Sequence, residues 1–228
     1  MARPPNPDAP HRLLEAARRA FAEVGVDAAR VQDIAAYAGF SKAAFYLYYD
    51  SKEAVFAQVI GQFFARMNAV AHDRLDALTA LIASTGPTET TSEDRLDSYA
   101  ELDHRYRVLG LSAMWEDRDI VGCILEQTTG PRRAVVDQFI EIARTTMLAD
   151  LREAVAAGYL RRDLDGELVS EMIVGIYLQL GRRMVRLAET PDLVAWAREI
   201  DSFVSDGIGR CHPTLQSDKL DATERRDP

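Results

Sequence analysis

The stretch that decides the fold is residues 31–52, which read Val-Gln-Asp-Ile-Ala-Ala-Tyr-Ala-Gly-Phe-Ser-Lys-Ala-Ala-Phe-Tyr-Leu-Tyr-Tyr-Asp-Ser-Lys. Apolar residues such as Ile34 and Ala38 recur at helical spacing and predict a short helix with one apolar face. Gly39 favours a break after that helix, and Ser41 is a residue type that often caps the start of the next one. Two short helices joined by a glycine turn form a helix-turn-helix, whose second helix can enter the major groove of DNA.

A longer pattern surrounds this motif, from Arg12 to Phe56. Its members keep a fixed spacing and are Leu14, Ala17, Phe21, Gly25, Val31, Gln32, Asp33, Ile34, Ala35, Ala38, Gly39, Ser41, Lys42, Phe45, Tyr46, Tyr48, Ser51, Lys52, Glu53 and Ala54. In this span the chain resembles the TetR family of bacterial one-component repressors. The resemblance implies an all-α chain: an N-terminal three-helix, helix-turn-helix DNA-binding domain, followed by a helical bundle that binds a ligand and dimerises. An alternative for the motif is an ordinary helical hairpin buried in a larger core.

The resemblance assigns the DNA contacts to one outward face of the head: Arg30, Gln32, Ser41, Lys42, Ala44, Tyr46, Leu47, Tyr48 and Lys52. Lys42 opens the second helix of the motif, where side chains reach base edges. Tyr46 and Tyr48 look like the phosphate-contacting tyrosines of the family, and Lys52 like its phosphate-binding lysine. Tyr49, in contrast, is expected to pack against the next helix.

The net charge of −9 is unevenly distributed along the chain. Residues 1–60 hold seven basic and seven acidic side chains, so the whole acidic excess lies in residues 61–228. An acidic body would repel DNA from every face except the head. The charge therefore favours docking through one local surface over a diffuse coating of nucleic acid.

Composition places the chain among ordinary globular proteins. With 228 residues, 47% of them hydrophobic and 28% charged, it is long enough for one small and one medium domain. No stretch approaches the ~20 apolar residues of a membrane span, and the proline-rich N-terminus lacks the apolar core of a secretory signal. Cys123 and Cys211 lack the number and spacing of a disulfide framework or metal site. We therefore expect a cytoplasmic location.

Apolar residues at helical spacing predict a first helix over residues 8–24, ahead of the helix-turn-helix. A fourth helix is expected over 52–84, capped by Asp50 or Ser51, with Glu53 placed to close a capping box on Asp50. About 33 residues at ~1.5 Å each give a rod of ~50 Å. Because this rod is too long for the head, it is expected to run into the second domain.

Beyond a polar loop over residues 84–92 the pattern is helical again. The expected elements are a helix from Asp94 past Leu109, a short apolar segment from Ile120 to Leu125, a long helix from Gly130 to Gly158, a helix over 165–188 capped by Asp165, and a last helix over 191–209. The expected domains are residues 8–52 for DNA binding, 53–210 for effector binding and dimerisation, and 211–228 as a disordered tail.

The expected helix over 165–188 is apolar nearly all round. For this helix and for the one expected over 191–209, one side can face the core while the other must also be hidden. A homodimer that joins two helices from each subunit resolves this and fits the resemblance; a purely monomeric core is the alternative. The interface residues expected from this argument are Ile176, Gly181, Ala197 and Ile200.

The second domain supplies large, adaptable apolar side chains that could line a ligand pocket: Phe63, Met67, Tyr99, Tyr106, Met114, Trp115, Phe139, Met147, Met172 and Tyr177. The alternative is that these residues fill a solid core. Asp150 falls near the same stripe and could hold a cation, whereas His104 and Arg105 would favour an anion. The charge of the ligand is therefore left open.

No catalytic constellation is visible in the sequence. The glycines form neither a dinucleotide-binding nor a P-loop pattern, and the four histidines lack partners at zinc-ligand spacing. His72 and His104 lie on helices expected to face one another, which leaves a metal-assisted ligand site as an alternative. We expect that the chain is not an enzyme and needs no cofactor or metal.

Together these features predict a TetR-like transcriptional repressor that binds a palindromic double-stranded DNA operator as a homodimer. A small apolar effector is expected to release it, with no membrane partner. Two alternatives stay open: a helical-bundle interaction protein that does not bind DNA, and a DNA-binding regulator that responds to no ligand. The operator sequence, the effector and the direction of regulation are not determined by the sequence.

Overall fold

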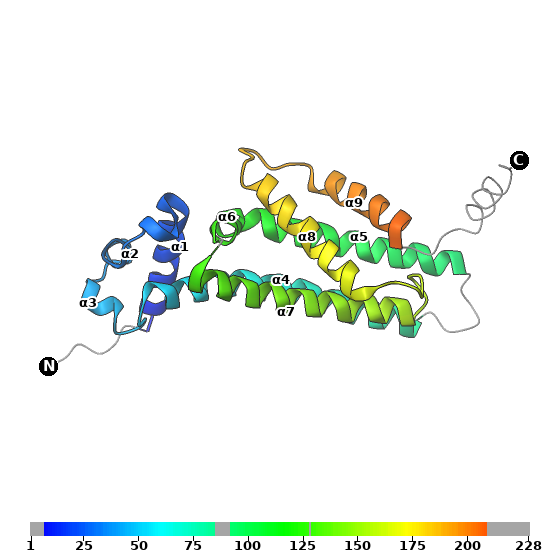
Figure 1. Cartoon of the computed structure of the whole chain (residues 1–228), viewed down its shortest axis with the longest axis horizontal. Helices are drawn as coiled ribbons and strands as arrows, with labels where there is room; N and C mark the ends of the chain where they lie inside the picture. The colour runs from blue at the N-terminus through cyan, green and yellow to red at the C-terminus, as the bar shows by residue number, and fades with distance from the viewer. Residues whose placement is uncertain (1–6, 85–91, 128, 209–228) are drawn as a thin grey trace, which may run out of the picture.

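The computed structural model describes residues 7–84, 92–127 and 129–208. Within these ranges the elements are nine helices, arranged as a small head and an elongated body (Figure 1). The all-α fold predicted from the sequence is confirmed. None of the described helices combines the length and the apolar character needed to cross a membrane.

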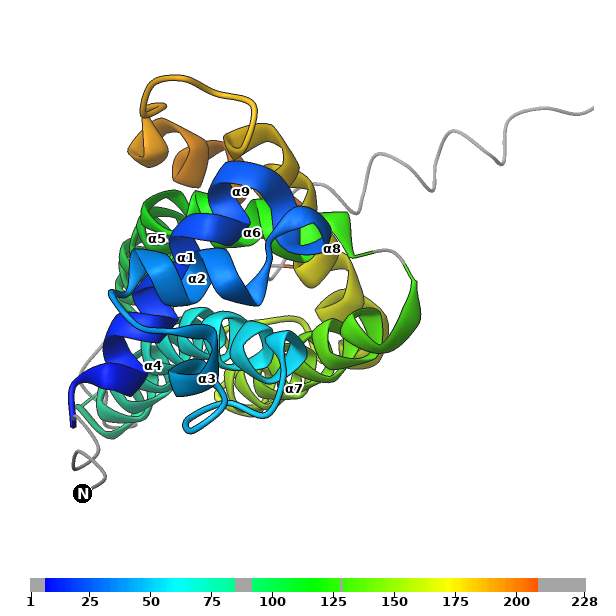
Figure 2. The same cartoon turned by 90° about the vertical axis from the view of Figure 1, so that its left-hand side faces the viewer.

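The head consists of α1, α2, α3 and the first turns of α4, and Figure 2 shows it end-on in front of the body. Their bounds are Ala9–Ala28 for α1, Val31–Tyr37 for α2, Lys42–Phe45 for α3 and Lys52–Ser84 for α4. Phe21, Ile34, Phe45 and Phe56 are fully buried between these helices, and the rings of Phe21 and Phe56 meet edge to face at 6.0 Å. Burial of such large side chains stabilises a head of this small size.

The turn of the helix-turn-helix forms as its sequence predicts. Gly39 has φ +74°, a left-handed conformation that a side chain would strain, and it ends α2. The Ser41 hydroxyl then accepts a hydrogen bond of 3.1 Å from the backbone N–H of Ala44, which caps α3. In α1, Gly25 has φ +78° and breaks the helical geometry, although helical hydrogen bonding resumes as far as Ala28.

Of the two residues predicted to cap α4, Asp50 and Ser51, the structure shows only one in that role. The Ser51 hydroxyl accepts the backbone N–H of Ala54 at 3.0 Å, so Ser51 is the cap. The capping box predicted between Asp50 and Glu53 is wrong, because the Glu53 carboxylate instead faces Arg132 of the body at 3.9 Å.

The body is built around α4, which extends from the head along its whole length, as predicted (Figure 1). The other helices are α5 (Ser92–Glu116), α6 (Arg118–Glu126), α7 (Gly130–Ala156), α8 (Gly166–Met184) and α9 (Leu193–Ile208). α5 and α7 pack along α4, α8 crosses from α7 to α6, and α9 lies on α5. One apolar cluster runs from the head into the near half of the body, so the two parts are joined by packing and not only by the chain.

Two predicted boundaries in the last part of the chain need correction. α8 ends at Met184 and not near residue 188, because the chain turns there and Leu187 packs back on the core. α9 begins at Leu193 and not at Pro191, because the Asp192 carboxylate accepts the N–H of Ala195 at 2.9 Å and caps the helix. The polar loop was predicted over residues 84–92, but Ser84 is the last residue of α4 and Ser92 the first of α5. The rest of that loop and the tail predicted at 211–228 lie outside the described residues.

Candidate DNA interface and effector cavity

The outward face of the head carries the side chains assigned to DNA. Lys42 and Tyr46 are exposed at α3, and Leu47, just after it, is 79% exposed. Arg30 and Gln32, at the start of α2, are exposed as well. None of these five side chains is part of the head's buried core, so all of them are accessible to a DNA molecule.

The remaining residues assigned to DNA are partly engaged within the head. Ser41 caps α3, Ala44 is half-buried, and Tyr48 packs partly against the core. Tyr49 is buried, as predicted, and its hydroxyl donates to the carbonyl of Pro10 at 3.1 Å.

Lys52 has a role that the sequence did not indicate. Its Nζ donates to the carbonyls of Val26, Asp27 and Ala29 at 2.7, 3.1 and 3.0 Å. These carbonyls lie where α1 ends, and a cation is favourable there because the last carbonyls of a helix carry partial negative charge. Lys52 therefore ties α4 to the connection between α1 and α2, and its contact with phosphate stays a prediction.

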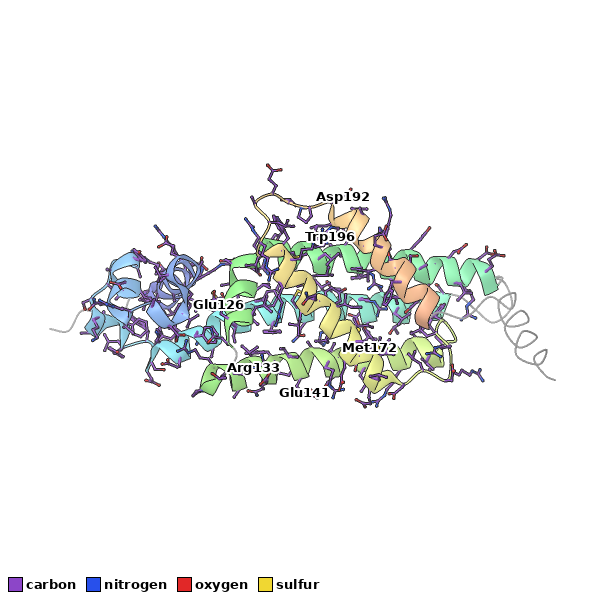
Figure 3. The ribbon with its side chains drawn as sticks, turned by 45° about the horizontal axis from the view of Figure 1, so that its top comes forward. Glu126, Arg133, Glu141, Met172, Asp192 and Trp196 are labelled. Atoms are coloured by element: carbon purple, nitrogen blue, oxygen red, sulfur yellow. The ribbon has the colours of Figure 1, made fainter. Side chains whose placement is uncertain are left out.

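The head meets the body at α6. Arg18 of α1 lies 2.8 Å from both Asp117 and Asp119 at the start of α6, and Arg66 of α4 lies 2.6 Å from Asp117. Asp117 is almost completely buried, so these ion pairs are shielded from salt more than a surface pair would be. Figure 3 shows Glu126, the last residue of α6, on the side of the body turned toward the head.

A cavity of about 180 Å³ lies in the body between α4, α5, α6, α7 and α8. Six of the predicted ligand residues line it: Phe63, Met67, Tyr106, Met114, Met147 and Tyr177. The sequence missed further apolar lining residues, among them Phe64, Val121, Ile124, Leu125, Ile140 and Val174. Three of these belong to α6.

The structure places the other four predicted ligand residues elsewhere. Tyr99 lines a second, more polar hollow of about 280 Å³ that adjoins the first cavity. Trp115 is buried beneath the Arg118 guanidinium, 4.4 Å from the ring centre. Phe139 stacks on Phe64 at 4.9 Å, behind the cavity wall. Met172 lies on α8 and is 52% exposed, so its prediction as an internal ligand contact is wrong (Figure 3).

An ion network lies at the junction of the cavity and the hollow. Arg74 contacts Asp103 and Asp150, each at 2.7 Å, and Arg107 contacts Asp103 and Asp201. Burial on its own would raise the pKa of Asp103, but the two guanidiniums hold it below its usual value. Burial raises the pKa of Asp150, and the single partner Arg74 offsets this only in part.

The residues expected to favour an anionic ligand do not line either space. His104 Nδ1 lies 2.6 Å from the carboxylate of Asp201, and Arg105 is exposed with its guanidinium 5.6 Å from the ring centre of Tyr106. His72 bonds to the carbonyl of Asn68 within its own helix. In the described part of the chain no three His, Cys, Asp or Glu side chains converge as a metal site would require.

Two of the four predicted dimer contacts face the interior of the same chain. A Cβ on Gly181 would lie 2.8 Å from Val121 of α6, and Ala197 is 0% exposed. These two predictions are wrong, because their side of each helix is the side that packs on the chain's own core. Ile176 and Ile200 are half-buried. The exposed apolar side chains of α8 and α9 are instead Leu168, Met172, Val194 and Phe203.

Comparison with known proteins identifies the head. Residues 13–59 match the family model described as bacterial regulatory proteins, tetR family. The chain belongs to the TetR family. The cavity and the ion network lie in the body, beyond the residues that match the family model.

Relatives cover most of this TetR-family chain. It is 29% identical over 200 residues to the uncharacterized HTH-type transcriptional regulator YdgC of Bacillus subtilis (strain 168), and the aligned residues cover 86% of this chain and 91% of YdgC. It is 26% identical over 173 residues to the HTH-type transcriptional repressor DhaR of Mycobacterium sp. (strain GP1), covering 71% and 75% of the two chains. The transcriptional regulator FadR of Bacillus subtilis, solved in complex with stearoyl-CoA, has the same fold with a TM-score of 0.63 at 20% identity, over 87% and 98% of the chains. This chain is therefore a TetR-family transcriptional regulator.

Proposed function

We propose that this regulator represses transcription as a homodimer on a palindromic operator and is released by a small ligand bound in the cavity. The residues proposed to contact DNA are Arg30, Gln32, Ser41, Lys42, Ala44, Tyr46, Leu47, Tyr48 and Lys52. Lys42 and Gln32 would read base edges, whereas Tyr46 and Lys52 would contact phosphates. Residues 8–52 form the proposed DNA-binding unit, and residues 53–210 the unit for the effector and the second subunit.

The observation that carries the ligand-dependent switch is the double role of α6. Val121, Ile124 and Leu125 of α6 line the cavity, while Asp117 and Asp119 at its start hold Arg18 of the head. A ligand that displaces α6 therefore pulls on α1 through the ion pairs of Arg18 with Asp117 and Asp119. A coupling of about 1–3 kcal/mol between ligand and DNA would be typical of such a device.

The proposed dimer forms through the outer faces of α8 and α9. Leu168 and Met172 on α8 and Phe203 on α9 expose large apolar side chains, and a second copy of the chain would cover them. Two heads related by a dyad would then bind half-sites about one helical turn of DNA, roughly 34–36 Å, or a multiple of it, apart.

The relatives support this proposal. DhaR is a repressor by name, and FadR was solved with an acyl-CoA bound, so a regulator of this fold can take a small-molecule ligand. The alternative of a regulator without a ligand is disfavoured by the cavity, which a solid core would not contain.

A gel-shift experiment with the DNA that flanks the protein's own gene tests the proposal. We expect one shifted species that resists competition by unrelated DNA, and footprinting of that species should protect a palindrome. Binding that unrelated DNA competes away equally would instead favour a helical-bundle interaction protein. Protection of a single half-site would contradict the dimer.

A further inference from the structure

The apolar cavity and the polar hollow meet at three shared residues. Arg74, Met147 and Asp150 line both spaces, so an elongated molecule can have its apolar part in one and its polar part in the other. The apolar part would lie against aromatic rings and methionines, which adapt to varied shapes. The polar end would lie where the ion network is.

Among the side chains that line the polar hollow, carboxylates outnumber guanidiniums. The carboxylates of Asp103, Asp150 and Asp201 surround the guanidiniums of Arg74 and Arg107. Every side-chain nitrogen of Arg74 donates to a group of the protein. An anion entering the junction would have to displace one of these bonds, whereas a cation would find an excess of acidic groups.

Two buried oxygens in this region lack a hydrogen-bond partner among the described residues. They are Oδ1 of Asp150 and the hydroxyl oxygen of Tyr159, and both residues are only 3% exposed. Both side chains line the polar hollow. Buried polar atoms without a partner destabilise a fold, so a bound group that donates hydrogen bonds to them would be favoured.

Two tyrosines form part of the wall of the hollow. Tyr99 and Tyr159 stack at 4.7 Å with nearly parallel rings, and the Arg95 guanidinium lies 5.5 Å from the ring centre of Tyr159. Because these neighbours cover the faces of the Tyr159 ring, Tyr159 can offer a ligand its hydroxyl oxygen and not its ring. The hollow thus offers a carboxylate oxygen and a phenol oxygen without partners among the described residues, and a protonated amine can donate to both.

We infer that the effector is a cationic amphiphile, whose apolar body fills the cavity and whose ammonium group donates to Asp150 and Tyr159. This inference rests on the proposed function, since it names the chemical class of the ligand proposed there. The raised pKa of the unliganded Asp150 agrees with it, because an incoming cation would restore the charged carboxylate.

Three eight-carbon probes that differ only in the head group test the inference: n-octylamine, 1-octanol and octanoate. Isothermal titration calorimetry of the full chain at neutral pH should show octylamine binding at least about tenfold more tightly than octanol, because a charged hydrogen bond is stronger than a neutral one. Octanoate should bind most weakly. Equal binding of the three probes, or preference for octanol or octanoate, would overturn the inference.

Variants locate the contact. Asp150→Asn should bring the affinities for octylamine and octanol to within about twofold of each other, and Tyr159→Phe should reduce the preference in part. Asp97→Asn is the matched control, because Asp97 is an exposed carboxylate that lines the same hollow. It should keep the preference of the unmodified chain. A preference for octylamine that survives Asp150→Asn would assign the cation to another site.

The comparison on the unmodified chain decides the matter even where Asp150→Asn folds poorly, and circular dichroism reports the folding of each variant. Failure of the inference is also separate from failure of the proposed function. A chain that binds its operator but prefers octanoate refutes only the cationic head group. A chain that shows no specific DNA binding refutes the proposed function.

Discussion

Replacing Gly181 by alanine tests whether this residue faces α6 of its own chain or a second subunit. The added Cβ would lie 2.8 Å from Cγ1 of Val121 and 3.3 Å from the terminal methyl of Met114. Carbon atoms in contact normally lie about 3.5–4.0 Å apart, so the Val121 methyl would have to move by roughly 0.7 Å. The methionine end can turn away, but the valine is branched at Cβ and stiff.

Two effects of opposite sign set the size of the change. Overpacking of a core costs about 1–3 kcal/mol, whereas alanine stabilises a helix interior by about 1 kcal/mol relative to glycine. We therefore expect Gly181→Ala to lower the free energy of unfolding by about 1 kcal/mol. In a chain that already carries Val121→Ala the clashing methyl is absent. There the same Gly181→Ala change should raise the free energy of unfolding by about 1 kcal/mol.

Urea unfolding followed by circular dichroism, at one fixed protein concentration, measures these differences. Gly110→Ala is the matched control, because Gly110 is also buried in a helix but its Cβ would meet Met67 at an ordinary 3.9 Å. This control should stabilise the chain by about 1 kcal/mol. Light scattering on each variant should give an unchanged molar mass.

Either of two results would refute the reasoning. One is a Gly181→Ala variant as stable as the Gly110→Ala variant, since the Val121 methyl would then not be in the way. The other is a change in molar mass with no dependence on Val121, which would place Gly181 at the contact between subunits.

Three further predictions concern DNA, assembly and pH. If Lys52 contacts a phosphate, Lys52→Ala should flatten the salt dependence of operator binding by about one unit of slope, and an unchanged slope would limit Lys52 to its contacts within the head. The same variant should lower the unfolding temperature, because three carbonyls lose their donor. Phe203→Glu, at a side chain 65% exposed, should yield folded monomers in light scattering, and a dimer of unchanged mass would contradict the proposed α8–α9 interface. Asp103→Asn should destabilise the chain by about 3 kcal/mol at pH 7. Because the folded pKa of Asp103 is lowered, the stability that its carboxylate contributes is complete above the unfolded pKa of about 3.9. In urea titrations at lower pH, the difference from the unmodified chain should therefore vanish.

The sequence predicted the head well because its signals are local. Gly39 and Ser41 act on their immediate neighbours, through a backbone conformation and a cap three residues away. The long α4 was equally predictable, since it needs only helical spacing and the absence of a breaker. The cap at Ser51 shows the limit: two adjacent residues both suited the role, and the body's Arg132 lies beside Glu53.

The body was predicted as helices but not as a site. Six of ten proposed pocket residues line the cavity, whereas Met172 lies on the outside of α8. A helix that is apolar nearly all round gives no sign of which side faces its own core, and this ambiguity placed Gly181 at the wrong surface.

By itself, then, the sequence determined the all-α class, the helix-turn-helix and the long shared helix, because these follow from spacing and from contacts within a few residues. Only the tertiary structure decided that α6 joins the cavity to the head, that Lys52 ties α4 to α1, and that Arg74, Asp103 and Asp150 meet inside the body. These contacts join residues 23 to 101 positions apart. Contacts over such separations depend on how helices cross and rotate against one another, and the periodicity of a single helix does not encode that.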